Sequence, residues 1–381
     1  MDVQGLRENI ERIFKLNFKE REELGASVSV WIDGQEIISL ADGYCEKERV
    51  RPWDETTIVP VWSATKGLAS ACVLKILDEQ SLSLDVKVVE IWPKFGGSGK
   101  EDISFKDVLT HGAGIPSLNE HVSVFNYEEV IRAIEMQNPA WEIGLGHGYH
   151  PRTFGFLLDE FVRRLEGISL GQYFNEAFAV PMGLEFWIGL PQEYHPRVAT
   201  LYPGKISNPD EEEAFYRAFK DSGSLTRKAF GSPTGLGGVS GMNSPDSWSA
   251  GWPAMGGIGT AQALAKFYSM LANGGEWDGK RIVSKYVLSL MEEALVSGED
   301  KVLCMENAFS AGFMKGRNDP IRRKLFGSSK SAYGHSGAGG SHAFADPENR
   351  IAFAYTMNQM NYGVLPGSKV LDMVDVIYGI E

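Results

Sequence analysis

The chain has 381 residues, which suits one large domain or a domain with a sizeable insertion, and its apolar (43%) and charged (23%) fractions are those of an ordinary globular protein. Its net charge of −13 repels phosphate backbones, so a nucleic-acid partner is not expected. Apolar runs as long as about 18 residues are missing, and no membrane-spanning helix is expected.

The first 20 residues, MDVQGLRENIERIFKLNFKE, mix acidic and basic side chains and have no continuous apolar stretch. They are unlike a secretory signal. Their apolar residues instead have the spacing of a surface helix: Leu6, Ile10, Ile13, Phe14 and Leu16. The three cysteines are too few and too scattered for a disulfide framework. We therefore expect a cytoplasmic protein.

Alternating apolar residues predict strands near both ends of the chain. Residues 26–43 alternate on both sides of Asp33-Gly34, a strong signal for a two-residue hairpin turn. Residues 342–360 do the same around a turn predicted at 346–349. One antiparallel sheet built from both ends of the chain would satisfy this pattern.

Three segments between these strands have helical patterns. Residues 63–80 carry apolar side chains at the spacing of a buried helix. Residues 151–167 open with a proline suited to a first helical turn and close on Gly167. Residues 260–275 start at Thr260, a candidate cap.

This order of elements predicts an α+β fold, an α/β/α sandwich whose antiparallel sheet is flanked by helices. Residues 1–80 and 250–381 should form that sandwich. Residues 81–249 should form an inserted, mainly helical domain with substrate-lining loops.

Residues 231–257 are rich in Gly, Ser and Pro but also hold Trp248 and Trp252. A flexible linker has no need of tryptophans, so we interpret this segment as a long ordered loop beside a binding site. The alternative is a surface loop that the two rings simply anchor.

Several kinds of site are not supported. The chain has no G-x-S-x-G elbow and no H-E-x-x-H, and GGSGK at 96–100 lacks the first glycine of a phosphate loop, since Lys94 stands there. His147 and His150 are three residues apart, but no further ligand residues accompany them, so a solvated or capping role is expected. We expect neither a metal nor a cofactor.

Ser63 and Lys66 form an S-x-x-K motif at the start of the first predicted buried helix. Residues i and i+3 share a helix face, so the lysine nitrogen can reach the serine oxygen. A serine needs a nearby base, and burial lowers a lysine pKa until the amine accepts a proton. The alternative is a lysine whose charged end extends to the surface.

Two later segments could complete such a site. Tyr149, just before the 151–167 helix, could shuttle a proton beside the lysine, or it could be a packing residue. In the glycine-rich segment 333–341, the amides of Ala338 and Ser63 could form an oxyanion hole, or the glycines could mark a β-bulge.

The order S-x-x-K, tyrosine and H-S-G resembles the serine β-lactamases, the penicillin-binding proteins and, most of all, the family VIII carboxylesterases. Six blocks in order carry the resemblance: VWSATKG (61–67), LTHGAGIP (109–116), GYHPRTFGFLLDEFVRR (148–164), VPMGLEFWIGLP (180–191), GGIGTAQALAKFYSMLANGG (256–275) and GHSGAGGSHAFADPENRIAFAYTMNQM (334–360).

The resemblance implies an acyl-enzyme on Ser63, Lys66 as base, Tyr149 as proton shuttle and base for the attacking water, and an oxyanion hole from the amides of Ser63 and Ala338. It places His335, Ser336 and Gly337 where lactamases carry K-T-G to bind substrate. We add Trp252 as a substrate-binding residue because its loop should line the site.

Two departures favour a neutral ester over an anionic lactam. Pro151 stands where the lactamase tyrosine motif ends in asparagine, and His335 stands in place of the K-T-G lysine. The expected function is hydrolysis of small to medium carboxylic esters, with weak β-lactam turnover. The alternatives are a β-lactamase or D-alanyl-D-alanine peptidase, an acyltransferase, or a non-catalytic scaffold that kept the fold.

Overall fold

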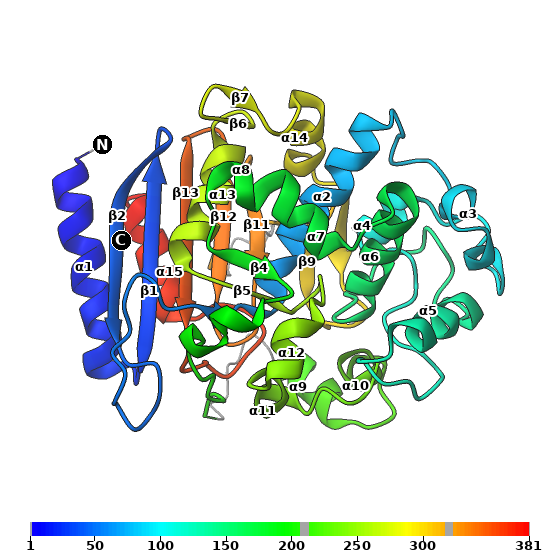
Figure 1. Ribbon diagram of the computed structural model, residues 1–381, viewed down its shortest axis with the longest axis horizontal. Helices are drawn as coiled ribbons and strands as arrows, with labels where there is room; N and C mark the ends of the chain where they lie inside the picture. The colour runs from blue at the N-terminus through cyan, green and yellow to red at the C-terminus, as the bar shows by residue number, and fades with distance from the viewer. Residues whose placement is uncertain (1, 206–212, 317–322, 381) are drawn as a thin grey trace.

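An antiparallel sheet forms the centre of the fold (Figure 1). The computed structural model describes residues 2–205, 213–316 and 323–380. Within these ranges the sheet has eight strands, in the order β2-β1-β13-β12-β11-β10-β9-β8. Their bounds are β1 Gly25–Ile32, β2 Gln35–Gly43, β8 Val296–Glu299, β9 Glu306–Phe309, β10 Met314–Lys315, β11 Tyr333–Ser336, β12 His342–Asp346 and β13 Ile351–Met357.

The two ends of the chain meet in this sheet, as the sequence predicts. Strands β1 and β2 are joined by Asp33 and Gly34, whose φ angles of 52° and 78° are the left-handed values of a tight hairpin turn. β1 pairs on its other side with β13, so that Val28 lies opposite Tyr355. The N-terminal hairpin and the C-terminal strands therefore form one continuous surface.

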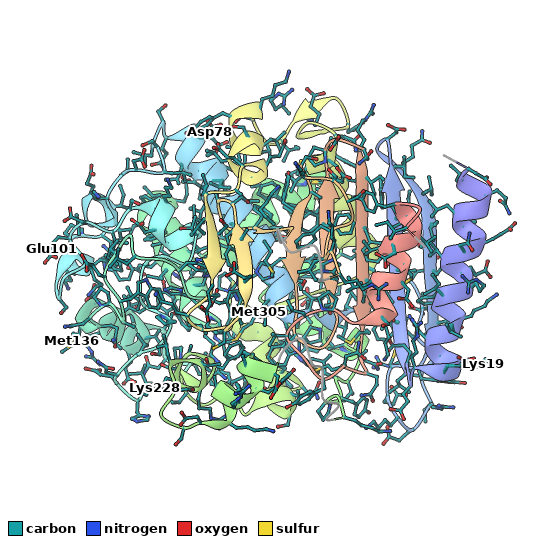
Figure 2. The ribbon with its side chains drawn as sticks, turned by 180° about the vertical axis from the view of Figure 1, so that it is seen from behind. Lys19, Asp78, Glu101, Met136, Lys228 and Met305 are labelled. Atoms are coloured by element: carbon teal, nitrogen blue, oxygen red, sulfur yellow. The ribbon has the colours of Figure 1, made fainter. Side chains whose placement is uncertain are left out.

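Helices cover both faces of the sheet and give the predicted α/β/α sandwich. Figure 2 shows α1 (Val3–Glu20) and α15 (Ser368–Ile377) lying against one face. On the other face, α13 (Ala261–Ala272) packs on β1, β12 and β13. Helix α2 (Thr65–Glu79) contacts β11, α6 (Thr153–Glu166), α7 (Leu170–Phe174) and α14 (Lys285–Glu292). It therefore joins the sheet to the helical part of the molecule.

Helix α2 is embedded almost completely, and one glycine allows this. A Cβ atom on Gly67 would lie 2.2 Å from the Tyr268 hydroxyl oxygen and 3.0 Å from the Phe313 ring. A larger side chain there would push α2 away from α13. The close packing fixes the start of α2, where the predicted nucleophile lies.

Residues 81–249 supply no strand to the large sheet within the described ranges. Their one strand, β4 (Phe186–Ile188), joins a three-stranded sheet with β5 (Gly257–Gly259) and β3 (Val59–Pro60). The remaining helices of this segment are α3 Val88–Ile91, α4 Phe105–Leu109, α5 Tyr127–Met136, α8 Val180–Met182, α9 Glu213–Lys220, α10 Leu225–Gly231, α11 Gly238–Met242 and α12 Pro245–Ala250. The predicted division into two domains stays a prediction.

The helix ends show where local sequence signals suffice. Gly167 ends α6 at a φ of 75°, and the Thr260 hydroxyl accepts a hydrogen bond from the Ala263 amide at the start of α13, both as predicted. The prediction of one long loop at 231–257 is wrong, because α11 and α12 lie within it. The Ser244 side chain caps α12, whose first residue is Pro245.

No helix in the described ranges combines the length and the apolar composition needed to cross a bilayer. A small two-stranded sheet, β6 (Glu276–Trp277) with β7 (Lys280–Arg281), lies between α13 and α14 in the chain.

Candidate active site

Ser63 lies in a tight turn, Trp62–Ala64, directly before α2. Trp62 has a φ of 51°, a left-handed value that is rare for a large side chain and marks strain next to the serine. Hydrogen bonds hold the turn in this shape: the Thr65 hydroxyl donates to the Trp62 carbonyl at 2.5 Å and accepts from the Gly257 amide at 2.9 Å. The strained turn places Ser63, which is half-buried, at the N-terminal end of the helix.

Lys66 is completely buried, and its Nζ lies 3.3 Å from the Ser63 Oγ. The same nitrogen is 2.9 Å from the carbonyl oxygens of Pro151 and Ala254. Burial lowers the pKa of Lys66 well below its ordinary value, which favours a neutral amine. A neutral amine has two N–H groups and one lone pair. Because the two carbonyls accept both N–H groups, the lone pair is left for the serine hydroxyl.

Tyr149 completes the cluster. Its side chain forms a hydrogen bond with Ser63, and its ring centroid lies 4.7 Å from the Lys66 Nζ. Burial raises the pKa of the phenol, and the negative charge of Asp300 raises it further, although the hydrogen bond to Ser63 acts in the opposite direction. The phenol is therefore protonated at neutral pH and can donate a proton. The structure thus brings together the three predicted catalytic residues.

The histidines around Tyr149 are buried, which contradicts the predicted solvated or capping role. The amide of His150 donates to Nδ1 of His111 at 3.2 Å. The His150 ring donates from Nδ1 to the Gly148 carbonyl at 2.7 Å and accepts at Nε2 from the Ile115 amide at 2.9 Å. These bonds fix the backbone on either side of the tyrosine. The i,i+3 spacing of His147 and His150 gave no signal for this role.

In the described segment after β11, the Ala338 amide has no carbonyl partner. The Gly337 amide donates to the Ser341 carbonyl at 2.6 Å, and the Gly339 amide donates to the Gly363 carbonyl at 3.0 Å. In the described part of the chain, the amide of Ala338 between them donates to no carbonyl. It is the amide that the sequence assigned to the oxyanion hole.

This free amide is near the nucleophile because β11 lies against the Ser63 turn. A Cβ atom on Gly337 would lie 2.1 Å from the Val61 carbonyl oxygen, so only glycine permits this approach. The Ser63 amide also donates to no protein acceptor within the described ranges. Two unused amides, those of Ser63 and Ala338, are therefore carried by adjoining segments, as an oxyanion hole requires.

His335 and Ser336 take part in the strand rather than supplying a cation. Nδ1 of His335 donates to the Ser336 carbonyl at 2.7 Å, while Nε2 is buried with no partner in the described structure. Burial lowers the pKa of His335 to about 3, so the ring is neutral near pH 7. The Ser336 hydroxyl donates to Nδ1 of His342 at 3.0 Å. The positive charge of a K-T-G lysine is therefore missing at this position.

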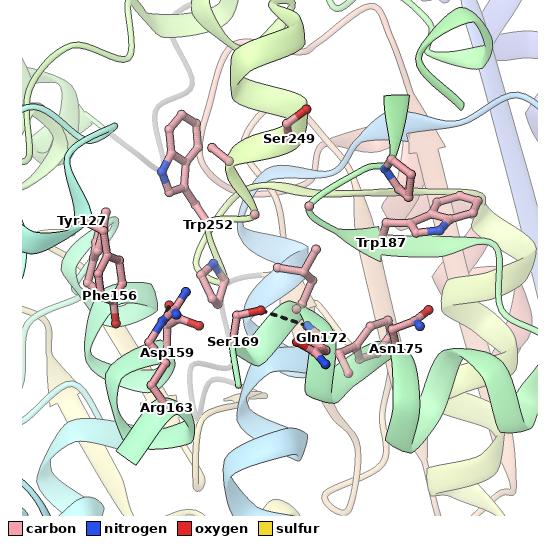
Figure 3. Close-up of a pocket in the computed structure, with 18 residues that line it drawn as sticks. Tyr127, Phe156, Asp159, Arg163, Ser169, Gln172, Asn175, Trp187, Ser249 and Trp252 are labelled. Atoms are coloured by element: carbon pink, nitrogen blue, oxygen red, sulfur yellow. Dashed lines mark hydrogen bonds and ion pairs between the residues drawn. The ribbon is translucent and has the colours of Figure 1, made fainter. Parts of the chain in front are cut away.

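Trp252 lines a separate pocket of about 540 Å³, shown in Figure 3. Its walls come from α6, α7 and residues 187–191 and 249–253, and none of the three catalytic residues lines it. The Trp252 indole donates to the Val124 carbonyl at 3.1 Å and packs edge-on against Phe125. The residues that line this pocket do not include the catalytic cluster, and the predicted contact of Trp252 with substrate stays a prediction.

Sequence reasoning missed the groups that hold the catalytic side chains. The carbonyls of Pro151 and Ala254 bind Lys66, and the carboxylate of Asp300 binds the Tyr149 amide. Backbone carbonyls have no sequence signal, and Asp300 is 151 residues from the tyrosine that it contacts. The described residues contain no group of three or more His, Cys, Asp or Glu side chains that could hold a metal ion.

Comparisons with known proteins agree with this geometry. The esterase/beta-lactamase LipL of Mycobacterium tuberculosis is 30% identical over 358 residues, covering 92% of this chain and 81% of LipL. The crystal structure of a family VIII carboxylesterase is 31% identical with a TM-score of 0.87, covering 98% of this chain and 97% of that one. A penicillin-binding protein homologue from Caulobacter crescentus is 29% identical with a TM-score of 0.85 and the same coverage.

The family model described as Beta-lactamase matches residues 10–368, nearly the whole chain. The match includes the serine, the lysine, the tyrosine and the glycine-rich turn, which the fold brings to one place. The chain therefore belongs to the beta-lactamase family of serine hydrolases.

Proposed function

We propose that this protein is a carboxylesterase that forms an acyl-enzyme on Ser63. One observation carries the proposal: the Nζ of a fully buried Lys66 lies 3.3 Å from the serine oxygen and 2.9 Å from two backbone carbonyl oxygens, and burial lowers its pKa toward the neutral amine. An amine in this state is a base beside a weak nucleophile that needs one.

In the acylation step, the Ser63 Oγ attacks the ester carbonyl carbon and its proton passes to Lys66. The carbonyl oxygen becomes an oxyanion that accepts hydrogen bonds from the amides of Ser63 and Ala338, each worth about 3 kcal/mol in the transition state. The carbon–oxygen bond to the alcohol then breaks. Tyr149 gives its proton to the leaving oxygen and recovers one from the Lys66 ammonium.

In the deacylation step, water attacks the acyl carbon. Burial and the charge of Asp300 disfavour a tyrosinate at Tyr149, so the phenol passes the water proton to Lys66 instead of keeping it. The bond from the acyl carbon to Ser63 breaks and the serine oxygen regains a proton. The carboxylic acid leaves, and the neutral amine is restored.

The proposed substrate is a small, neutral carboxylic ester. His335 is neutral and buried at the position where a lysine would bind the carboxylate of a β-lactam, and Pro151 offers only a backbone carbonyl, already bonded to Lys66. LipL and the family VIII carboxylesterase, two of the most similar proteins, are named as esterases. The cytoplasmic location, the small-molecule ester as partner and the expectation of no nucleic-acid or membrane partner stay predictions.

The test compares wild type with Ser63→Ala on p-nitrophenyl butyrate, and identifies by mass spectrometry the residue that a phosphonate probe modifies. The variant should lose all measurable turnover, and the probe should modify Ser63 alone. Turnover by folded Ser63→Ala, or a label on another residue, contradicts the proposal. Nitrocefin and an added acceptor alcohol, assayed in parallel, measure lactamase and acyltransferase activity. If either exceeds ester hydrolysis in kcat/KM, the substrate assignment is wrong.

A further inference from the structure

Asp300 is a fully buried carboxylate that lies outside the catalytic cluster and reaches its tyrosine. It follows β8 and begins the turn that leads to β9, a turn that contains Met305 near the middle of the view in Figure 2. The Tyr149 amide donates to both of its oxygens, at 2.9 Å to Oδ1 and 3.0 Å to Oδ2. The Asp300 side chain therefore forms hydrogen bonds with the backbone amide of Tyr149, the residue that we assign to proton transfer.

The rest of the carboxylate is bound by uncharged N–H groups. Oδ1 also accepts from the amides of Val302 and Leu303, each at 2.8 Å, and Oδ2 accepts from Nδ2 of Asn307 at 3.0 Å. In the described part of the chain, no lysine or arginine forms an ion pair with Asp300; His147 Nε2 lies 3.8 Å away. The carboxylate is therefore stabilised by N–H groups of its own turn, of Asn307 and of Tyr149, and the bond to Tyr149 is the one that leads to the catalytic cluster.

Further hydrogen bonds hold the residues before and after Tyr149. The His147 carbonyl accepts from the Lys301 amide at 3.0 Å, within the same turn as Asp300. His111 accepts two hydrogen bonds from this segment. Its Nδ1 accepts from the His150 amide, and its carbonyl accepts from the Gly148 amide at 3.1 Å. The residues on both sides of Tyr149 thus have little freedom, and Asp300 alone bonds the amide of Tyr149 itself.

We propose that Asp300 is a positioning residue that fixes the Tyr149 peptide and keeps its phenol the proton donor to the leaving alcohol. This inference rests on the proposed acyl-enzyme mechanism. The negative charge of Asp300 also raises the pKa of Tyr149. This shift favours a phenol that donates a proton and disfavours a tyrosinate that acts as a base. Asp300 touches no reacting atom, so it acts only through the tyrosine.

The test uses Asp300→Asn with two esters of one acid. An alkyl ester needs a proton on its leaving oxygen, whereas a p-nitrophenyl ester releases a stable phenolate without one. In Asp300→Asn, the new amide nitrogen faces Nδ2 of Asn307, and two donors cannot bond each other. The Tyr149 peptide should shift, and kcat/KM, which reports acylation but not the shared deacylation step, should fall on the order of 100-fold on the alkyl ester, with about tenfold or less on the p-nitrophenyl ester.

A second variant restores the hydrogen bonds. In Asp300→Asn combined with Asn307→Asp, the new amide at 300 donates to the new carboxylate at 307, while its oxygen still accepts from the Tyr149 amide. The carboxylate at 307 also accepts from Nε2 of His147, which lies 2.5 Å from Oδ1 of Asn307. We expect kcat/KM on the alkyl ester to return to within about tenfold of wild type. If the single variant does not fold, this double variant decides alone by the same criterion.

The matched control is Asp346→Asn, another fully buried carboxylate, which accepts hydrogen bonds from the Ser331 and Tyr378 hydroxyls at the far end of β12. It should lower stability and leave the ratio of the two kcat/KM values unchanged. Equal losses of Asp300→Asn on both esters, or no recovery in the folded double variant, overturn the inference. If Ser63→Ala remains active, the proposed function fails first; if that variant is inactive while Asp300→Asn matches wild type, only the inference fails.

Discussion

Replacing Gly337 by alanine tests the oxyanion hole through a clash that the structure defines. The new Cβ would lie 2.1 Å from the Val61 carbonyl oxygen, whereas real Cβ atoms stay at least 3.0 Å away. The two backbone segments must therefore separate by about 0.9 Å. One of these segments continues into Ala338 and the other into Ser63, so the separation falls between the two amides of the oxyanion hole.

The size of the effect follows from hydrogen-bond geometry. A donor at about 2.9 Å from the oxyanion would move to about 3.8 Å, beyond the range of a hydrogen bond. Losing one oxyanion donor costs about 3 kcal/mol, or about 100- to 1,000-fold in kcat. KM should change little, because the oxyanion exists only in the transition state and the intermediates.

The assay is initial-rate hydrolysis of p-nitrophenyl butyrate, with denaturant unfolding to measure stability. The control is Gly171→Ala in α7, whose Cβ would lie 2.0 Å from the Ile188 carbonyl oxygen, a similar backbone clash beside the pocket of Figure 3. Both variants should lose about 1–3 kcal/mol of stability, but only Gly337→Ala should lose kcat. A folded Gly337→Ala with kcat within about threefold of wild type would refute the reasoning.

Three further outcomes are expected. Burial lowers the pKa of Lys66, so kcat/KM should already be high well below about pH 10.4, the ordinary lysine value; activity that rises only near that pH would contradict the assignment of the base. At pH values between the lowered Lys66 pKa of the folded state and about 10.4, the unfolded chain binds a proton at this lysine that the folded protein does not. The free energy of unfolding should therefore rise with pH, by at most about 1.4 kcal/mol per pH unit relative to Lys66→Met. Denaturant titrations at several pH values measure this slope. Thr260→Ala should lower the free energy of unfolding by about 1 kcal/mol through loss of the α13 cap, with kcat unchanged in the folded enzyme; an equal stability for both proteins would show that the cap contributes nothing.

Much of the fold could be predicted because its signals are local. The turn at Asp33-Gly34, the cap at Thr260 and the left-handed Gly167 each depend on a few neighbouring residues, and the structure has all three as predicted. The wrong prediction at 231–257 arose from composition: glycine and proline suggested a loop, although the capping sequence before Trp248 starts a short helix.

The catalytic cluster could be predicted in part because two of its residues are one helical turn apart. Ser63 and Lys66 must share a helix face once α2 forms, so their proximity follows from spacing alone. Tyr149 and Ala338 were candidates with open alternatives until the resemblance assigned their roles, since spacing says nothing about residues so distant in the chain. The histidines were misjudged because a sequence does not reveal burial, and burial decides whether an imidazole is solvated or serves as a backbone ligand.

The sequence by itself determined the helix start that pairs a serine with a lysine, the hairpin, and the meeting of both chain ends in one antiparallel sheet. Only the tertiary structure decided that the pKa of the lysine is lowered, since that shift comes from its complete burial. The tertiary structure likewise decided that Asp300 accepts a hydrogen bond from the Tyr149 amide. Desolvation and hydrogen bonding act between atoms that are close in space, and distance along the chain does not record them.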